Sequence, residues 1–197
     1  ALQRSRAAGD RPEEASALNG IGTVYWTQGE MQKTLETRNE ALQLSRAAGD
    51  RRREAAILNN IGVIHWILGE TQKAWEKYSE ALPITRAVGD RSREANILSH
   101  IGLLYELLGE KRKALETYSE ALLIFQTLGD RNNQAVMLNG IGVVYRSLGE
   151  TRKALEKYNE ALQLSRAAGN LNTETRALSN IGEVYRSLGE MRKALEK

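Results

Sequence analysis

The sequence predicts an all-α protein built from stacked antiparallel helix pairs, an α-solenoid. Three observations predict it: one pattern of glycines returns five times with a period of 40 residues, apolar residues recur every three or four positions, and no segment alternates apolar and polar residues as a strand would. Because one such pair of helices cannot bury its apolar stripes alone, successive pairs must stack on one another.

Two kinds of break divide each repeat into two helices. Gly-Glu pairs such as Gly29-Glu30 and Gly-Asp pairs such as Gly49-Asp50 recur along the chain. Glycine is common just after a helix because it accepts a positive φ, and Asp or Asn is favoured where the next helix begins. In the first repeat we expect a first helix, helix A, over about 11–28 and a second, helix B, over about 30–48. The whole chain then has nine complete helices, with part of a helix B at each end.

The repeats are expected to form a single solenoid over residues 1–197. Residues 1–10 repeat residues 41–50 with one change, so the sequence opens within a helix B, and it closes within another. We expect these ends to be complementary, with Leu2 at one end and Ala194 and Leu195 at the other able to meet in end-to-end self-association. The predicted repeats are about 11–50, 51–90, 91–130, 131–170 and a partial 171–197, after a partial helix B at 1–10.

Small residues mark the places where helices should approach closely. A glycine in mid-helix costs about 1 kcal/mol relative to alanine, so Gly22 and its equivalents predict a close contact between helices. We expect alanines of helix B to lie opposite these glycines, namely Ala41, Ala74, Ala81, Ala114, Ala121, Ala154 and Ala161.

One proline lies inside a predicted helix. Pro83 removes the hydrogen bond from its own nitrogen to the carbonyl of Ser79 and crowds that carbonyl. We therefore expect a local bend in the second helix B.

Composition restricts the classes of function. There are 28 Lys and Arg residues against 25 Asp and Glu, so the net charge of +3 is a small surplus that does little to favour nucleic-acid binding. No apolar stretch approaches the ~20 residues that span a bilayer, and the first residues lack the pattern of a signal peptide, so we expect a cytoplasmic location. The sequence has no cysteine, which excludes disulfides, thiolate metal sites and cysteine nucleophiles.

The remaining chemistry-bearing residues do not form an active-site pattern. His65 replaces a tyrosine of the apolar stripe and is expected in the core. His100 has no second histidine at a metal-ligand spacing and is expected on a groove. We therefore predict no catalytic residue, no metal and no cofactor.

The repeated strings resemble a known family. LNNIGVIHW and LNGIGVVYR, each followed by LGE, by KAW or KAL and by YSEAL or YNEAL, resemble the tetratricopeptide repeat in order and spacing over nearly the whole chain. Each repeat is six residues longer than the common 34-residue form, because helix B continues through Arg46 or Arg166 where the family usually has proline. Longer repeats of this kind resemble those of LGN/Pins spindle-orientation adaptors and bacterial signalling proteins. The resemblance implies a right-handed superhelix that binds proteins or peptides.

The resemblance also implies a binding surface on the outer face of helix A, which lines the concave groove in the family. Asparagines recur on this face, and a side-chain amide can both donate to and accept from a peptide backbone. Exposed aromatics and arginines are common interface anchors. The predicted peptide-binding residues are Asn19, Trp26, Asn59, Asn60, Val63, Trp66, His100, Leu103, Asn139, Arg146, Arg176, Asn180 and Arg186.

More than one function remains open at this point. The leading hypothesis is a non-catalytic scaffold that binds an extended segment, with apolar side chains near Trp26 and Trp66. Acidic side chains of the segment would then lie near Arg146, Arg176 and Arg186. The alternative is a structural or self-assembling array, natural or designed, and nucleic-acid binding has the weaker support of three arginines. The asparagines could instead bond within or between helices, the tryptophans could pack against the adjacent repeat, and the arginines could pair with Glu106 or Glu183.

Overall fold

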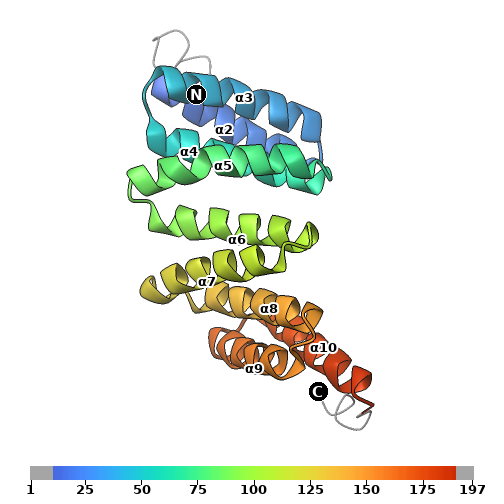
Figure 1. The fold of residues 1–197 in the computed structure, drawn as a ribbon. Coiled ribbons are helices and arrows are strands. Elements are labelled where there is room, and N and C mark those ends of the chain that lie inside the picture. The colour runs from blue at the N-terminus through green and yellow to red at the C-terminus, as the bar shows by residue number, and fades with distance from the viewer. Residues whose placement is uncertain (1–10, 190–197) are drawn as a thin grey trace. The chain divides into compact units, whose positions relative to one another are not determined.

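The computed structural model describes residues 11–189, and every regular element in that range is an α-helix. No helix among these residues is both long and apolar enough to cross a membrane. The partial helices predicted at 1–10 and 190–197, with the end contacts of Leu2, Ala194 and Leu195, lie outside the described range. The helices (Figure 1) are α2 (Arg11–Thr27), α3 (Met31–Ala47), α4 (Arg51–Ile67), α5 (Thr71–Ala87), α6 (Arg91–Leu107), α7 (Lys111–Thr127), α8 (Arg131–Ser147), α9 (Thr151–Ala168) and α10 (Leu171–Ser187).

The helix boundaries confirm the predicted punctuation. Gly29 has a φ of 76°, and the N–H of the following Glu30 donates to the carbonyl of Tyr25 at 2.9 Å, which closes the end of α2. At the start of α4, the carboxylate of Asp50 accepts a hydrogen bond from the N–H of Arg53 at 3.0 Å. The first helix pair, α2 and α3, therefore begins and ends within one residue of the predicted positions.

The chain divides into two compact units. The N-terminal unit comprises residues 1–97 and the C-terminal unit residues 98–197, so the boundary lies within α6. In the described part of the N-terminal unit, α2 packs on α3, α3 on α4, and α4 on α5. In the C-terminal unit, α7 packs on α8, α8 on α9, and α9 on α10. Each unit is thus built from helices that pack on their neighbours in the chain, as a solenoid requires.

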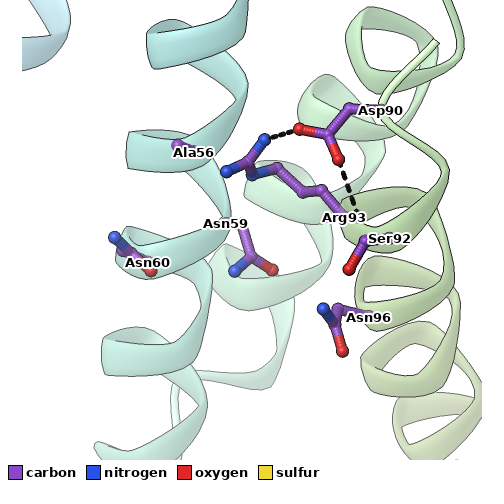
Figure 2. A pocket seen from close by; sticks show the side chains of 7 residues that line it. All are labelled: Ala56, Asn59, Asn60, Asp90, Ser92, Arg93 and Asn96. Carbon is purple, nitrogen blue, oxygen red and sulfur yellow. Dashed lines mark hydrogen bonds and ion pairs between the residues drawn. The ribbon is translucent and has the colours of Figure 1, made fainter. Parts of the chain in front are cut away.

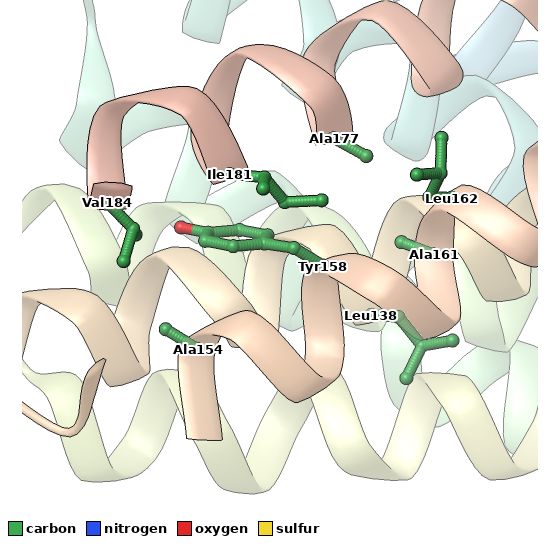
Figure 3. Packing of buried hydrophobic residues seen from close by; sticks show 8 residues of the cluster. All are labelled: Leu138, Ala154, Tyr158, Ala161, Leu162, Ala177, Ile181 and Val184. Carbon is green, nitrogen blue, oxygen red and sulfur yellow. The ribbon is translucent and has the colours of Figure 1, made fainter. Parts of the chain in front are cut away.

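A buried tyrosine holds the helices of the C-terminal unit together. Tyr158 of α9 is fully buried, and it belongs to one cluster with Ala154 of its own helix and with Ile181 and Val184 of α10 (Figure 3). Burial raises the pKa of the Tyr158 hydroxyl to about 12. This residue therefore ties one helix pair to the next through apolar contacts.

Aromatic rings lie against the mid-helix glycines. A Cβ on Gly142 would lie 2.5 Å from the ring of Tyr158, and one on Gly62 would lie 2.6 Å from the ring of Tyr78. The predicted close contact at these glycines is confirmed, but the alanines expected opposite them are not the nearest groups. Tyr158 lies four residues after Ala154 on helix B, and its ring reaches the backbone of helix A at Gly142. The methyl group of an alanine is too short to make this contact.

The arginines near the end of helix B, where the family usually has proline, bond to the following helix A. Arg46 Nε donates to Glu54 Oε1 at 3.0 Å in the N-terminal unit, and Arg166 Nε donates to Glu174 Oε1 at 2.8 Å in the C-terminal unit. Each bond joins a helix B to the following helix A. Because Glu54 is only 4% exposed, its carboxylate needs this partner in the fold.

Pro83 does not interrupt its helix. α5 runs unbroken over the 17 residues from Thr71 to Ala87, the same length as α3 and α7, and Pro83 is exposed. The bend predicted between Ser79 and Pro83 stays a prediction.

Candidate functional site

A polar cavity of about 220 Å³ lies between α4 and the start of α6 in the N-terminal unit (Figure 2). Two of the predicted binding residues, Asn59 and Asn60, line it together. Its other lining residues are Ala56, Asp90, Ser92, Arg93 and Asn96. This cavity is the place where the structure brings predicted polar side chains of the N-terminal unit to a common space.

The α6 side of the cavity is held by its own hydrogen bonds. The carboxylate of Asp90 accepts a hydrogen bond from the N–H of Arg93 at 3.0 Å, and its second oxygen pairs with the Arg93 guanidinium. The first bond caps the N-terminus of α6. The charges on this wall therefore neutralise each other, and the wall has a defined shape.

Asn59 carries an acceptor without a donor on the opposite wall. Its Oδ1 is buried and accepts no hydrogen bond from the described residues. Figure 2 shows the side chain directed from α4 toward Ser92 and Asn96. A buried acceptor that lacks a donor costs about 1–3 kcal/mol. A ligand that offers an N–H or O–H at this point would recover that free energy.

The preceding repeat has an equivalent acceptor. Asn19 lies 40 residues before Asn59, and its Oδ1 is likewise buried without a hydrogen-bond donor among the described residues. Asn60 lies 41 residues after Asn19, the same spacing at which Asn180 bonds to Asn139 in the C-terminal unit. No hydrogen bond joins the side chains of Asn19 and Asn60. Helices α2 and α4 therefore each carry a buried amide oxygen that has no donor among the described residues, one repeat apart.

Apolar residues of the predicted surface are partly exposed. In the N-terminal unit, Trp66 is 37% exposed, while Trp26 and Val63 are half-buried. In the C-terminal unit, Leu103 is half-buried. Partial exposure of large side chains leaves contact area that a ligand can cover.

Three of the predicted polar residues of the C-terminal unit are bonded within the fold. Asn180 Nδ2 donates to Asn139 Oδ1 at 3.0 Å, and Asn139 is only 2% exposed. The guanidinium of Arg146 pairs with the carboxylate of Glu183. Here the alternative of bonding between helices is the arrangement found. Arg176 and Arg186 are both exposed.

The two histidines lie in different surroundings. Burial lowers the pKa of His100 to about 4, so its imidazole is neutral at pH 7. His65 is largely buried on the apolar stripe, with 12% of its side chain exposed, and its Nδ1 lies 2.5 Å from the carboxylate of Glu70. Among the described residues, no group of three or more His, Cys, Asp or Glu side chains is placed to hold a metal ion.

The residues on the α6 side of the cavity were not among the predicted binding residues. Asn96 stands at the same repeat position as the predicted Arg176, 80 residues later, so the 40-residue period could have found it. Asp90 and Arg93 carry no comparable signal, because a capping residue occurs at the start of every helix A.

Comparison with known proteins identifies a repeat family. A tetratricopeptide repeat model matches residues 13–87, 53–127, 93–167 and 133–197. No curated protein sequence matches the chain.

Several solved structures share the fold of this chain. BtubC from P. vanneervenii is 23% identical, with a TM-score of 0.84 over 99% of this chain and 83% of BtubC. The nearly identical TPR-like repeats of a putative kinesin light chain from Podosopora anserina are 13% identical, with a TM-score of 0.73 over 94% of this chain and 92% of that one. A Rap protein complexed with competence and sporulation factor is 18% identical, with a TM-score of 0.76 over 91% of this chain and 50% of the Rap protein. These likenesses confirm the all-α solenoid fold.

Proposed function

This chain belongs to the tetratricopeptide repeat family of protein-interaction modules, and on that premise we propose that it is a non-catalytic scaffold for an extended segment of another protein. The segment binds along the outer face of the A helices. The observation that carries the proposal is the buried, donor-free Oδ1 of Asn59 in a polar cavity of about 220 Å³.

The backbone of an extended segment offers the N–H donors that the asparagine oxygens of this face do not find among the described residues. Each residue of such a segment except proline offers one N–H donor and one C=O acceptor, and a side-chain amide can satisfy both. The N–H groups would donate to Asn59 and, one repeat away, to Asn19. Because backbone groups are the same for every sequence, these contacts supply affinity, whereas Val63 and Trp66 supply selectivity for apolar side chains.

A solved relative of similar fold supports the ability of such an array to hold a ligand. The Rap protein described above was solved complexed with competence and sporulation factor. This chain spans about half the length of that protein, so only the presence of a bound factor on a similar fold is carried over to the proposal.

Binding measurements with an Asn59→Ala variant test this proposal. A partner is first captured on the full chain, and its binding segment is mapped with synthetic peptides. Asn59→Ala should then weaken the mapped peptide about fivefold to tenfold, as expected for one lost hydrogen bond of about 1 kcal/mol. The matched control is Gln43→Ala on α3, an exposed side chain on helix B. If Gln43→Ala abolishes binding while Asn59→Ala leaves it intact, the helix A face is not the site.

The alternative of a self-assembling array has a separate test. Light scattering over a concentration series should show a constant molar mass if the chain is a scaffold for other proteins. A mass that grows with concentration, without an added partner, would favour the structural array.

A further inference from the structure

A buried arginine replaces a tyrosine in the first repeat. Arg38 of α3 occupies the position that Tyr78, Tyr118 and Tyr158 occupy in the following repeats. It is only 7% exposed, and its side chain lies along α2, where a Cβ on Gly22 would lie 3.2 Å from its Cγ. The cation is therefore packed into a place that the fold otherwise gives to an aromatic ring.

No counter-charge accompanies this arginine within the described residues. Its Nε is buried without a hydrogen-bond partner, and no carboxylate of that range pairs with its guanidinium. Its Cζ lies 5.9 Å from the ring centroid of Trp26, a cation–π contact that leaves the charge itself unneutralised. Burial lowers the pKa of Arg38. Arg46 and Arg93 of the same unit, by contrast, both have a carboxylate partner.

The tyrosine at the equivalent position of the third repeat bonds to a carboxylate of helix A. The hydroxyl of Tyr118 donates to Glu106 Oε2 at 3.0 Å. Glu106 stands at the helix A position that Trp26 occupies in the first repeat, on the face predicted to bind. At this position of the fold, a helix B side chain can therefore meet a carboxylate on the binding face.

We propose that Arg38 anchors a carboxylate of the bound segment beside Trp26. This inference rests on the proposed function and names the chemistry of its ligand. A guanidinium offers a planar fork of N–H donors that matches a carboxylate, and exclusion of water strengthens such a pair. The acidic residue of the segment then binds in the N-terminal unit, and Arg146 is not its partner because Glu183 already pairs with that guanidinium.

The carboxylate could belong to an Asp or Glu side chain or to the C-terminus of the segment. Two libraries of random 12-residue peptides distinguish these sources, one with free C-termini and one with amidated C-termini. Each library is selected on the full chain and, in parallel, on an Arg38→Tyr variant. This variant restores the residue of the other repeats and should fold. Arg146→Gln is the matched control, because it removes a cation that is already paired.

A charge preference that depends on Arg38 is the expected result. Peptides selected on the unmodified protein should carry an acid at one fixed position, and converting that acid to its amide should weaken binding about tenfold or more. Arg38→Tyr should bind the acidic and amide forms equally, and Arg146→Gln should keep the preference. Loss of binders from the amidated library alone would identify the C-terminal carboxylate as the ligand group.

Two results would overturn the inference while the scaffold proposal survives. One is an acid preference that persists in Arg38→Tyr, and the other is binding by the unmodified protein without any acid preference. Absence of binders from both libraries would instead overturn the proposed function and this inference together.

Thermal unfolding without ligand gives an independent readout. Removal of an unpaired buried charge should raise the Tm of Arg38→Tyr above that of the unmodified protein. A decrease of about 4 °C or more would show that Arg38 is satisfied inside the folded chain and would refute its role as an anchor.

Discussion

The two units use the same repeat positions in different ways. In the C-terminal unit, Asn139 and Asn180 bond to each other across two helices, and Asn139 is almost completely buried. In the N-terminal unit, Asn19 and Asn60 stand at the equivalent positions, and the Oδ1 of Asn19 accepts no hydrogen bond from the described residues. One pair of amides therefore bonds within the fold, whereas the other pair does not bond to itself.

The arginines of the two units differ in the same way. Arg146 of the C-terminal unit pairs with Glu183 on the next helix A, whereas Arg38 of the N-terminal unit is buried without a carboxylate partner among residues 11–189. Residue type alone thus does not make a binding group. A polar side chain on this fold is available to a ligand only where no neighbouring helix has already satisfied it.

Alanine at the mid-helix glycines should produce the largest difference between the units. Gly142→Ala places a methyl 2.5 Å from the ring of Tyr158, so overpacking should lower the free energy of unfolding by about 1–3 kcal/mol. Gly22→Ala places it 3.2 Å from the flexible chain of Arg38, which can move aside, and the better helix propensity of alanine contributes up to about 1 kcal/mol. Urea denaturation measures the free energy of unfolding of both variants. Equal losses at the two positions would contradict the expectation that the arginine side chain moves aside more easily than the tyrosine ring.

Substitution of the asparagines should have the next largest effect. Asn139→Ala removes the acceptor of Asn180 and should lower the free energy of unfolding by about 1–2 kcal/mol. Asn19→Ala removes an acceptor that has no donor and should change it by less than about 0.5 kcal/mol, or raise it. Chemical denaturation of the two variants side by side checks this. A similar loss in both would mean that Asn19 is also bonded in solution, through water.

The ion pair of the C-terminal unit should have the smallest effect. The side chains of Arg146 and Glu183 are 37% and 43% exposed, so solvent screens the pair. Arg146→Gln should therefore cost less than about 1 kcal/mol. The difference should shrink in about 1 M salt, where the Debye length is about 3 Å. Arg186→Gln, at an exposed position, is the control and should change nothing. A large, salt-independent loss for Arg146→Gln would show that the pair is shielded from water.

The helices and their boundaries were predictable because their signals act within one turn of the chain. Gly49 needs only its own backbone to adopt a positive φ, and Asp50 caps α4 through a residue three positions away. Stacking followed from the same local pattern, since an amphipathic helix pair must bury its apolar stripes. The cavity was less predictable, because Asp90 and Arg93 carry the ordinary pattern of a helix start and become lining residues only when α4 lies beside α6.

The sequence by itself determined the all-α solenoid and the 40-residue repeat, because period and punctuation are properties of neighbouring residues, and its resemblance to the family implied the candidate face of helix A. Only the tertiary structure decided that the tyrosine rings lie on the glycines. It also decided that, within the described part of the chain, Asn139 Oδ1 is bonded while Asn59 Oδ1 is not, and Arg38 has no carboxylate partner. A hydrogen bond or ion pair forms only when two atoms meet within about 3 Å at a suitable angle. For side chains some 40 residues apart, that distance depends on how two helices pack, which repeat spacing alone does not specify.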